Sequence, residues 1–288
     1  MKEEIIKLSK KVGIDEIGFC NKNNLLVNYD KYKLQDNLNY KCSFQIGDIS
    51  DKDLTNIKYS KYNTVIACLQ SYKKVNFKDK NKVYVSGFAV NKDYHKVLKD
   101  KLNKICEYLK ANGYICESFV DNNPLDEKLL AYNCGLGFFG KNNLLINKRL
   151  GSCFNIGIIL TDLKIDGDKI VNYNCGNCNL CIKACPNKAL DNGILNQKKC
   201  LSYLTQKKNL ENYEEINFNN CIYGCDICSL VCPYNKNIEY SEYDGIDINE
   251  FLNMSEEEFK EKYKDYSFYW RGKKVLDRNI NIYKKVDK

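Results

Sequence analysis

Two stretches of closely spaced cysteines could carry redox chemistry in this chain. The first, CGNCNLCIKACP, runs from Cys175 to Pro186 and reads C-x2-C-x2-C-x3-C-P. Three thiolates at two-residue intervals can wrap one iron–sulfur cubane, and the three-residue interval places the fourth about one turn into a following helix. The second stretch, CDICSLVCPYN from Cys225 to Asn235, repeats these intervals without a first thiol. The spacing predicts two 4Fe-4S clusters, because structural zinc sites use well-separated cysteine pairs.

In two-cluster proteins with this run, the fourth cysteine binds the other cluster. Crossing the ligands in this way assigns cluster one to the thiols of Cys175, Cys178, Cys181 and Cys232. Cluster two receives Cys185, Cys225, Cys228 and one further thiol. That thiol is either Cys221, one residue before the position of a full repeat, or Cys200 in KKCLSYLT. The residues alone leave both open.

Length, charge and cysteine usage favour a reducing compartment. The chain has 288 residues, 16 cysteines and a formal charge of +8. A disulfide framework is typical of short secreted chains, whereas this charged N-terminus has no apolar signal-peptide core and no run approaches the roughly 18 apolar residues of a membrane span. We expect a soluble cytoplasmic protein whose clusters and free thiols persist. Cysteines at 20, 42, 68, 106, 116, 134 and 153 have no ligand spacing and are expected mostly in the core.

The chain before the first cysteine run alternates strand and helix patterns. Apolar, β-branched runs predict strands at 16–20, 64–69, 83–90, 115–120 and 153–161. Helical spacing predicts helices over 2–12, 93–112 and about 124–134, with Asn123 as the cap of the third and Pro124 in its first turn. Residues 21–61 have no clear period, and GLGFFGKNNLL is predicted to be a glycine-rich loop. This alternation indicates an α/β domain with a three-layer core over residues 1–165.

Two further regions follow this domain. A ferredoxin-like domain with both clusters is expected over 166–240, and a helical extension over 241–288. Within the extension, Ser255-Glu256-Glu257-Glu258 predicts a capping box at a helix start, and a last helix is expected near 272–283. Residues 260–288 contain ten Lys and Arg against four Asp and Glu. This excess could serve an anionic partner or simply form a solvated helix face.

The residues before the clusters must use the electrons, since a simple relay needs a far shorter chain. No P-loop and no G-x-G-x-x-G follow a predicted strand, so nothing indicates a nucleotide cofactor. The one histidine is His95. A lone histidine lies on a helix surface or in a core more often than it binds a metal.

The order of features resembles that of the epoxyqueuosine reductases, cobalamin and iron–sulfur enzymes that complete the queuosine base in tRNA. The stretches that carry the resemblance are KDYHKVL (92–98), FVDNNPLDEKLLA (119–131), GLGFFGKNNLL (135–145), GS (151–152), CLSYLT (200–205) and IYGCDICSLVCPYN (222–235), besides the first cysteine run. SEEEF (255–259) and RN (278–279) extend it. The D-x-x-P-x-x-E element followed by G-L-G-x-x-G-K and two cluster runs is far more specific than the cluster runs alone.

The resemblance implies a nitroreductase-like, cobalamin-binding domain over residues 1–165 and chooses Cys200 as the fourth thiol of cluster two. It places the family's catalytic acid on Asp121, whose carboxyl would be kept protonated near neutral pH by burial against the corrin ring. Contacts to the corrinoid would come from Lys141, Asn142, Gly151 and Ser152. Histidine-ligated cobalamin proteins resemble D-x-H-x-x-G, and Leu98 stands where that glycine is needed, so a base-off corrinoid without a histidine ligand is expected.

The reaction implied is the two-electron conversion of an epoxide to an alkene in the anticodon loop of tRNA, with oxygen leaving as water. An external low-potential donor would supply the electrons to an enzyme expected to be a monomer. One alternative is a corrinoid-dependent reductase of a small molecule, resembling reductive dehalogenases. The other is a non-catalytic, two-cluster electron carrier.

The chain departs from the family pattern in two places. Relatives read like S-R-Y-A-x-G-R-D-Y-H where this chain has Gly87 and Asn91, which puts one polar contact near the site in doubt. It also ends soon after Arg278-Asn279, where many relatives continue into a helical-repeat domain. We therefore expect a smaller tRNA contact surface, in which residues 260–288 and Trp270 matter more, although a core anchor is the commoner role for such a tryptophan.

Overall fold

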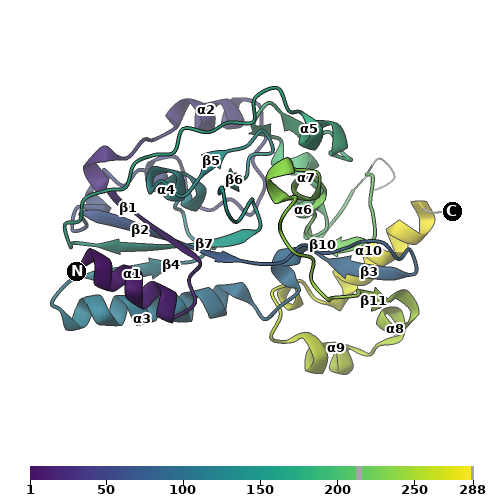
Figure 1. Ribbon diagram of the computed structural model, residues 1–288. Helices are drawn as coiled ribbons and strands as arrows, with labels where there is room; N and C mark the ends of the chain where they lie inside the picture. Colours follow the sequence, from purple (N-terminus) through teal and green to yellow (C-terminus); the bar gives the residue numbers. More distant parts are fainter. Residues whose placement is uncertain (212–215, 287–288) are drawn as a thin grey trace.

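The computed structural model describes residues 1–211 and 216–286 (Figure 1). Its helices are α1 (Lys2–Lys11), α2 (Tyr29–Asn37), α3 (Tyr94–Ala111), α4 (Glu127–Asn133), α5 (Leu180–Ala184), α6 (Leu201–Leu204), α7 (Ile227–Leu230), α8 (Ile248–Asn253), α9 (Glu256–Tyr263) and α10 (Lys273–Val286). Its strands are β1 (Glu16–Asn21), β2 (Thr64–Ser71), β3 (Lys82–Val85), β4 (Cys116–Phe119), β5 (Phe138–Phe139), β6 (Leu145–Ile146), β7 (Phe154–Thr161), β8 (Leu190–Asp191), β9 (Ile194–Leu195), β10 (Cys221–Tyr223) and β11 (Ile246–Asp247).

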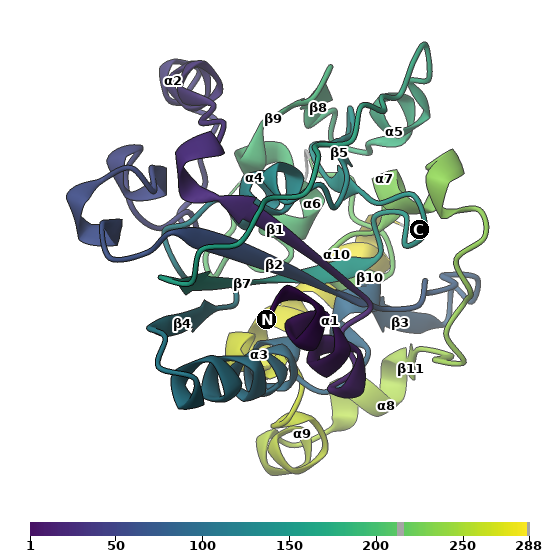
Figure 2. The same cartoon turned by 60° about the vertical axis from the view of Figure 1, so that its left-hand side comes forward.

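The main sheet has the strand order β1-β2-β7-β4, and each neighbouring pair is antiparallel. Helices α1 and α3 cover one face and α4 covers the other, which forms the three layers predicted from the sequence (Figures 1 and 2). On the α3 face, Leu98, Leu102, Ile105 and Leu109 are completely buried, because their spacing aligns them along one side of the helix. Gly157 of β7 permits this packing, since a Cβ there would lie 2.6 Å from Leu102 Cδ1.

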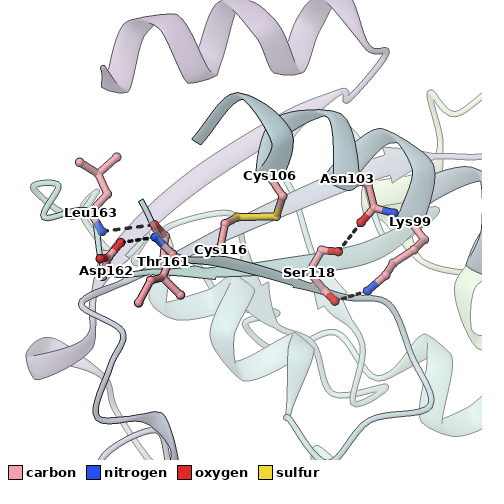
Figure 3. Close-up of a disulfide and its surroundings, with 9 residues drawn as sticks. Lys99, Asn103, Cys106, Cys116, Ser118, Thr161, Asp162 and Leu163 are labelled. Atoms are coloured by element: carbon pink, nitrogen blue, oxygen red, sulfur yellow. Dashed lines mark hydrogen bonds between the residues drawn. A yellow bond between two sulfur atoms is a disulfide. The ribbon is translucent and has the colours of Figure 1, made fainter. Parts of the chain in front are cut away.

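Helix α3 and strand β4 are also joined covalently. Cys106 and Cys116 form a disulfide with their Cα atoms 5.4 Å apart (Figure 3). We expected both as core residues and both are buried, but they are paired rather than free. Cys20, Cys68, Cys134 and Cys153 are free and buried, as expected, and Cys42 is half-buried.

Three local predictions fail. The stretch GLGFFGKNNLL is not only a loop, because β5 within it pairs antiparallel with β6. Asn123 does not cap α4; its side chain instead accepts the Leu125 N–H at 3.0 Å and closes a tight turn, and Asp126 caps the helix by accepting from Leu129 N. The strand predicted at 83–90 ends at Val85. Beyond it, Ser86 Oγ and Gly87 N donate to the carboxylate of Asp226 rather than to a neighbouring strand.

Strand β3 does not join the main sheet. It pairs in parallel with β10 from the cluster region and antiparallel with β11 from the C-terminal region. A separate hydrophobic core lies on this sheet, with Phe251, Phe259, Leu276 and Ile280 completely or almost completely buried. Residues 82–90 were expected in the first domain, over residues 1–165. They pack instead with segments of the expected cluster domain and of the C-terminal extension.

The C-terminal helices follow the sequence closely. Ser255 and Glu258 form the predicted capping box of α9, and α10 begins at Lys273. Asn279 of α10 is fully buried, and its amide donates to the carbonyl oxygens of Thr205 and Ile222 at 2.7 and 2.8 Å. These bonds attach the C-terminal region to the segments around the second cluster run. Over the described ranges, no helix combines the length and apolar character that crossing a membrane requires.

Candidate active site and cluster centre

Asp121 lies two residues beyond β4, next to the first turn of α3. Its Oδ2 atom accepts a 2.6 Å hydrogen bond from the Tyr94 hydroxyl and lies 3.3 Å from Nε2 of His95. The other ring nitrogen of His95 lies 2.6 Å from Oδ1 of Asp93, which also caps α3 by accepting from the His95 backbone N–H. The first turn of α3 thus holds a chain of ionisable groups that ends on Asp121. Lys99 of α3 also donates to the Ser118 carbonyl (Figure 3), fixing β4 beside this turn.

The protonation states of these ionisable groups differ from our expectation. Burial alone would raise the pKa of Asp121, but hydrogen bonds from His95, Tyr94 and the Asn122 N–H outweigh it and lower the pKa to about 2. Burial lowers the pKa of His95, whereas its bonds to Asp121 and Asp93 outweigh that effect and leave the pKa raised. The carboxyl predicted to be protonated is therefore ionised in this arrangement, and its histidine partner takes up a proton more readily than an ordinary imidazole.

Glu127 holds the loop that carries Asp121. Its Oε1 accepts the Asp121 N–H and an amide N–H of Asn123, both at 2.7 Å. Asp121 and Asn122 have φ values of 45° and 47°, a left-handed conformation that costs a non-glycine residue free energy and persists where surrounding bonds enforce it. Burial raises the pKa of Glu127 to about 7, with the nearby charge of Asp121 adding to the effect.

Aromatic rings surround the Asp121 region. The Tyr94 ring stacks on His95 with centroids 4.0 Å apart. The centroid of the Phe88 ring lies 5.9 Å from the ring centroids of Tyr94 and of Tyr223. Trp270 donates from Nε1 to the Tyr223 hydroxyl at 2.8 Å, but its side chain is 55% exposed. Trp270 is therefore not a core anchor. Its exposed ring has the half-buried Arg271 guanidinium 4.0 Å from its centroid, so a cation lies beside an exposed aromatic face.

The thiols assigned to cluster one surround a single cavity. Its lining includes Cys175, Cys178, Cys181 and Cys232 together with Lys141, Asn142, Ile146 and Tyr234. No three His, Cys, Asp or Glu side chains in residues 1–211 and 216–286 converge tightly enough for a single metal ion. Four thiols around one cavity are the ligand set of a 4Fe-4S cubane. The buried amide nitrogen of Asn142, which has no partner among the described atoms, also fits a group that would fill the cavity.

The thiols assigned to cluster two also lie near one another. Burial raises the pKa of Cys225 to about 12, and negative charge on Cys200 and Cys185 raises it further. The pKa of Cys228 is likewise raised by burial and by the charges of Cys225 and Cys200. A cationic iron cluster would relieve this repulsion. Cys221 is close to Cys225 as well, but its thiol donates to the Tyr223 carbonyl at 3.3 Å within β10.

The four residues expected to contact a corrinoid all have neighbours in the cluster region. Lys141 Nζ donates to the Gly176 carbonyl and to Asn179 Oδ1 at 2.9 and 2.8 Å, in the loop of the first cysteine run. Ser152 is buried, and its hydroxyl lies 3.0 Å from that of Ser229 and accepts from the Asn235 amide at 2.9 Å. Asn142 lines the cluster one cavity, and a Cβ at Gly151 would collide with Asn235 Oδ1 at 1.8 Å.

Comparison with known proteins agrees with both parts of the site. Residues 174–235 match the 4Fe-4S double cluster binding domain, and residues 57–122 match the family described as epoxyqueuosine reductase QueG, DUF1730. An epoxyqueuosine reductase of Bacillus anthracis is 32% identical over 97% of this chain and 78% of its own length. This chain belongs to the epoxyqueuosine reductase family. The enzyme of Bacillus subtilis is 31% identical over 97% of this chain and 77% of its own length.

Solved structures of epoxyqueuosine reductases share the whole fold. The enzyme from Streptococcus thermophilus superposes with a TM-score of 0.88 at 30% identity, covering 98% of this chain and 80% of that one. A complex with an epoxyqueuosine-modified tRNA-Tyr stem loop gives a TM-score of 0.88 at 29% identity over the same shares. In a Bacillus subtilis structure, with a TM-score of 0.85, the catalytic aspartate loop is swung out of the active site. A catabolic reductive dehalogenase matches at 16% identity and a TM-score of 0.51, which shows a shared fold alone.

The predicted family, the α/β fold and the double-cluster region are thus confirmed. Sequence reasoning missed the partners of Asp121, namely Tyr94, His95 and Glu127. The motif D-Y-H, followed 26 residues after His95 by the Asp121 of D-x-x-P-x-x-E, contained the only available signal. It could not show that a helix start and a strand end meet.

Proposed function

We propose that this epoxyqueuosine reductase family member reduces epoxyqueuosine to queuosine in tRNA, opening an epoxide and releasing its oxygen as water. The observation that carries the proposal is the carboxylate of Asp121, paired with His95 and Tyr94 beside an exposed aromatic surface, in a chain that also holds a double-cluster domain. The transformation needs two electrons and two protons. The double-cluster domain is suited to supply the electrons, and the Asp121 site is suited to supply the protons.

The electrons are proposed to pass through both clusters. Cysteines 175, 178, 181 and 232 would hold cluster one, while cysteines 185, 200, 225 and 228 would hold cluster two. Ferredoxin-type clusters work near about −400 mV, so they need an external donor of comparably low potential. All ligands and Asp121 come from one chain, which supports action as a monomer. A tRNA substrate supports action in the cytoplasm.

The proposed resident cofactor is cobalamin, which when bound would supply a low-valent cobalt able to deliver electrons to the epoxide carbon. The site fits it in one respect: Asp93 and Asp121 occupy both ring nitrogens of His95, so this imidazole is not free to bind cobalt, in agreement with a base-off corrinoid. Contacts from Lys141, Asn142, Gly151 and Ser152 to the corrinoid gain no support, because these residues contact the cluster region.

The proton path is proposed to end on Asp121. Protonated His95 would donate from Nε2, which lies 3.3 Å from Asp121 Oδ2, and the Tyr94 hydroxyl donates to the same oxygen. Asp121 would pass this proton to the opening epoxide oxygen while His95 and Tyr94 replace it. The low pKa of Asp121 makes its carboxyl a strong acid once protonated, and Asp93 stabilises the charged imidazole that supplies it.

The tRNA loop is proposed to bind across Trp270 and Arg271. Single-stranded bases stack on exposed aromatic rings, and Arg271 would contact phosphate or stack beside them. Because phosphate contacts release counterions, binding should weaken steeply as the salt concentration rises.

The test is anaerobic reconstitution of the protein with iron, sulfide and cobalamin, followed by a strong reductant and epoxyqueuosine-containing tRNA. Queuosine should appear in the digested tRNA, and the absorption spectrum should show corrinoid uptake. Fully loaded protein that forms no queuosine would refute the reaction. Cluster absorbance without corrinoid uptake would favour a simple electron carrier. Activity on a small halogenated substrate without salt-sensitive tRNA binding would favour the small-molecule alternative.

A further inference from the structure

Asn142 lies at the tip of the hairpin formed by β5 and β6, where the main domain reaches the first cysteine run. The hairpin closes through the Gly140 N–H, which donates to the Leu144 carbonyl at 2.9 Å. Asn142 itself is only 4% exposed. Lys141 and the Gly193 N–H, which donates to the Lys141 carbonyl at 3.1 Å, attach this tip to the cluster region.

The orientation of the Asn142 amide follows from its neighbour. Its Oδ1 accepts the Leu144 N–H at 3.2 Å. Since a backbone N–H can only donate, the atom facing it must be the amide oxygen, and the NH2 group must point the other way. That NH2 group is buried and has no hydrogen-bond partner among the described residues.

The unpaired NH2 group belongs to a residue that lines the cavity formed by the cluster one thiols. Buried donors are rarely left without an acceptor, because the lost hydrogen bond to water is then uncompensated. Sulfur atoms of a cluster held by Cys175, Cys178, Cys181 and Cys232 are the acceptors that this cavity would contain. The other polar lining residue at this tip, Lys141, already donates to Gly176 and Asn179.

We propose that Asn142 donates a hydrogen bond to a sulfur atom of cluster one and thereby raises the reduction potential of that cluster. The reduced cluster carries one more negative charge than the oxidised cluster, so a donor to sulfur stabilises the reduced form more strongly. Asn142 is a positioning residue for electron transfer rather than a catalytic residue. The inference rests on the proposed presence of cluster one but not on the substrate.

The test compares Asn142→Leu and Asn142→Asp with a matched control, Asn143→Gly. Asn142→Leu removes both the NH2 donor and the amide oxygen, whereas Asn142→Asp keeps an oxygen for the Leu144 N–H and replaces the donor with a negatively charged oxygen. Asn143 is the next residue of the same turn, does not line the cavity, and has a φ of 61° that glycine adopts readily. Its side chain accepts instead from Lys31 of α2 at 2.7 Å.

Reduction potentials are measured by anaerobic redox titration followed by electron paramagnetic resonance, with a Cys178→Ala variant assigning the cluster one signal. In Asn142→Leu the equilibrium constant for reducing cluster one should fall about tenfold, equivalent to 59 mV for one electron, and further in Asn142→Asp. Cluster two is the internal reference and should not shift, and Asn143→Gly should match the parent. Selective loss of cluster one in both Asn142 variants, with Asn143→Gly fully loaded, would also support the contact.

Both Asn142 variants carrying two clusters, with cluster one within twofold of the parent equilibrium, would overturn the inference. So would equal shifts of both clusters, since they would indicate a change in the fold rather than a local contact. A parent protein that binds no cluster at all would refute the proposed function first. Absence of queuosine formation with normal cluster potentials would refute only the substrate and would leave this inference intact.

Discussion

The Tyr94 hydroxyl donates a 2.6 Å hydrogen bond to Oδ2 of Asp121, joining the first residue of α3 to the loop that follows β4. The same oxygen faces His95, so two consecutive residues of one helix converge on one carboxylate. This convergence determines how the carboxylate is charged, and therefore how it can deliver a proton. Four predictions test it and the cluster assignment.

Removing the Asp121 carboxylate should lower the turnover rate more than removing the Tyr94 hydroxyl that donates to it. Asp121→Asn should slow queuosine formation by about 10² to 10⁴, the usual contribution of a positioned acid. Tyr94→Phe should slow it about tenfold, because one of several donors to the carboxylate is lost. Single-turnover rates and tRNA binding, measured separately, check both. An unchanged rate in Asp121→Asn would contradict the assignment.

The pH dependence should follow His95. Its pKa is raised above the ordinary value of about 6.5, so the protonated form is present at lower pH and is lost as the pH rises through the raised pKa. The rate should therefore fall on the alkaline side, and His95→Gln should be about tenfold slower without that fall. Asp121, with a pKa of about 2, stays ionised over the range tested. A parental profile in His95→Gln would exclude the histidine as proton source.

Glu127 should act through the position of Asp121. Glu127→Gln keeps an oxygen that can accept the Asp121 N–H and the Asn123 amide, and should retain activity within a few-fold. Glu127→Ala removes that acceptor from a strained loop and should lower kcat about 10- to 100-fold with little change in KM for tRNA. Steady-state kinetics separate the two. If the two variants were equally impaired, the acceptor role would be wrong.

The cluster count should distinguish two cysteines that the motif alone could not. Cys200→Ala should lose one cluster, whereas Cys221→Ala should keep both, because the Cys221 thiol is engaged with the Tyr223 carbonyl. Iron and acid-labile sulfide per chain provide the measurement. The reverse result would exchange the two assignments, and loss of a cluster in neither variant would exclude both cysteines.

Much of the fold was predictable from local patterns. Apolar runs located β1, β2, β4 and β7, the spacing of four leucine and isoleucine residues located α3, and the capping box located the start of α9. The cysteine runs predicted a double-cluster domain, because most ligands of each run lie within one short segment and their spacing can be read directly from the sequence. One wrong prediction from local residues concerns Asn123. This residue closes a turn rather than capping α4, because Asp126, directly before the helix, accepts the capping hydrogen bond.

By itself, the sequence determined the cysteine spacing, the strand and helix segments and the D-x-x-P-x-x-E element with its candidate acid. Only the tertiary structure decided that Asp121 is ionised, because its pKa depends on Tyr94 and His95, which arrive from a different element. Only the tertiary structure placed Lys141 and Asn142 beside the first cysteine run, at the cavity lined by Cys175, Cys178, Cys181 and Cys232. Spacing along the chain sets what neighbouring residues can do together, whereas charge and hydrogen bonding are set by residues that meet only after folding.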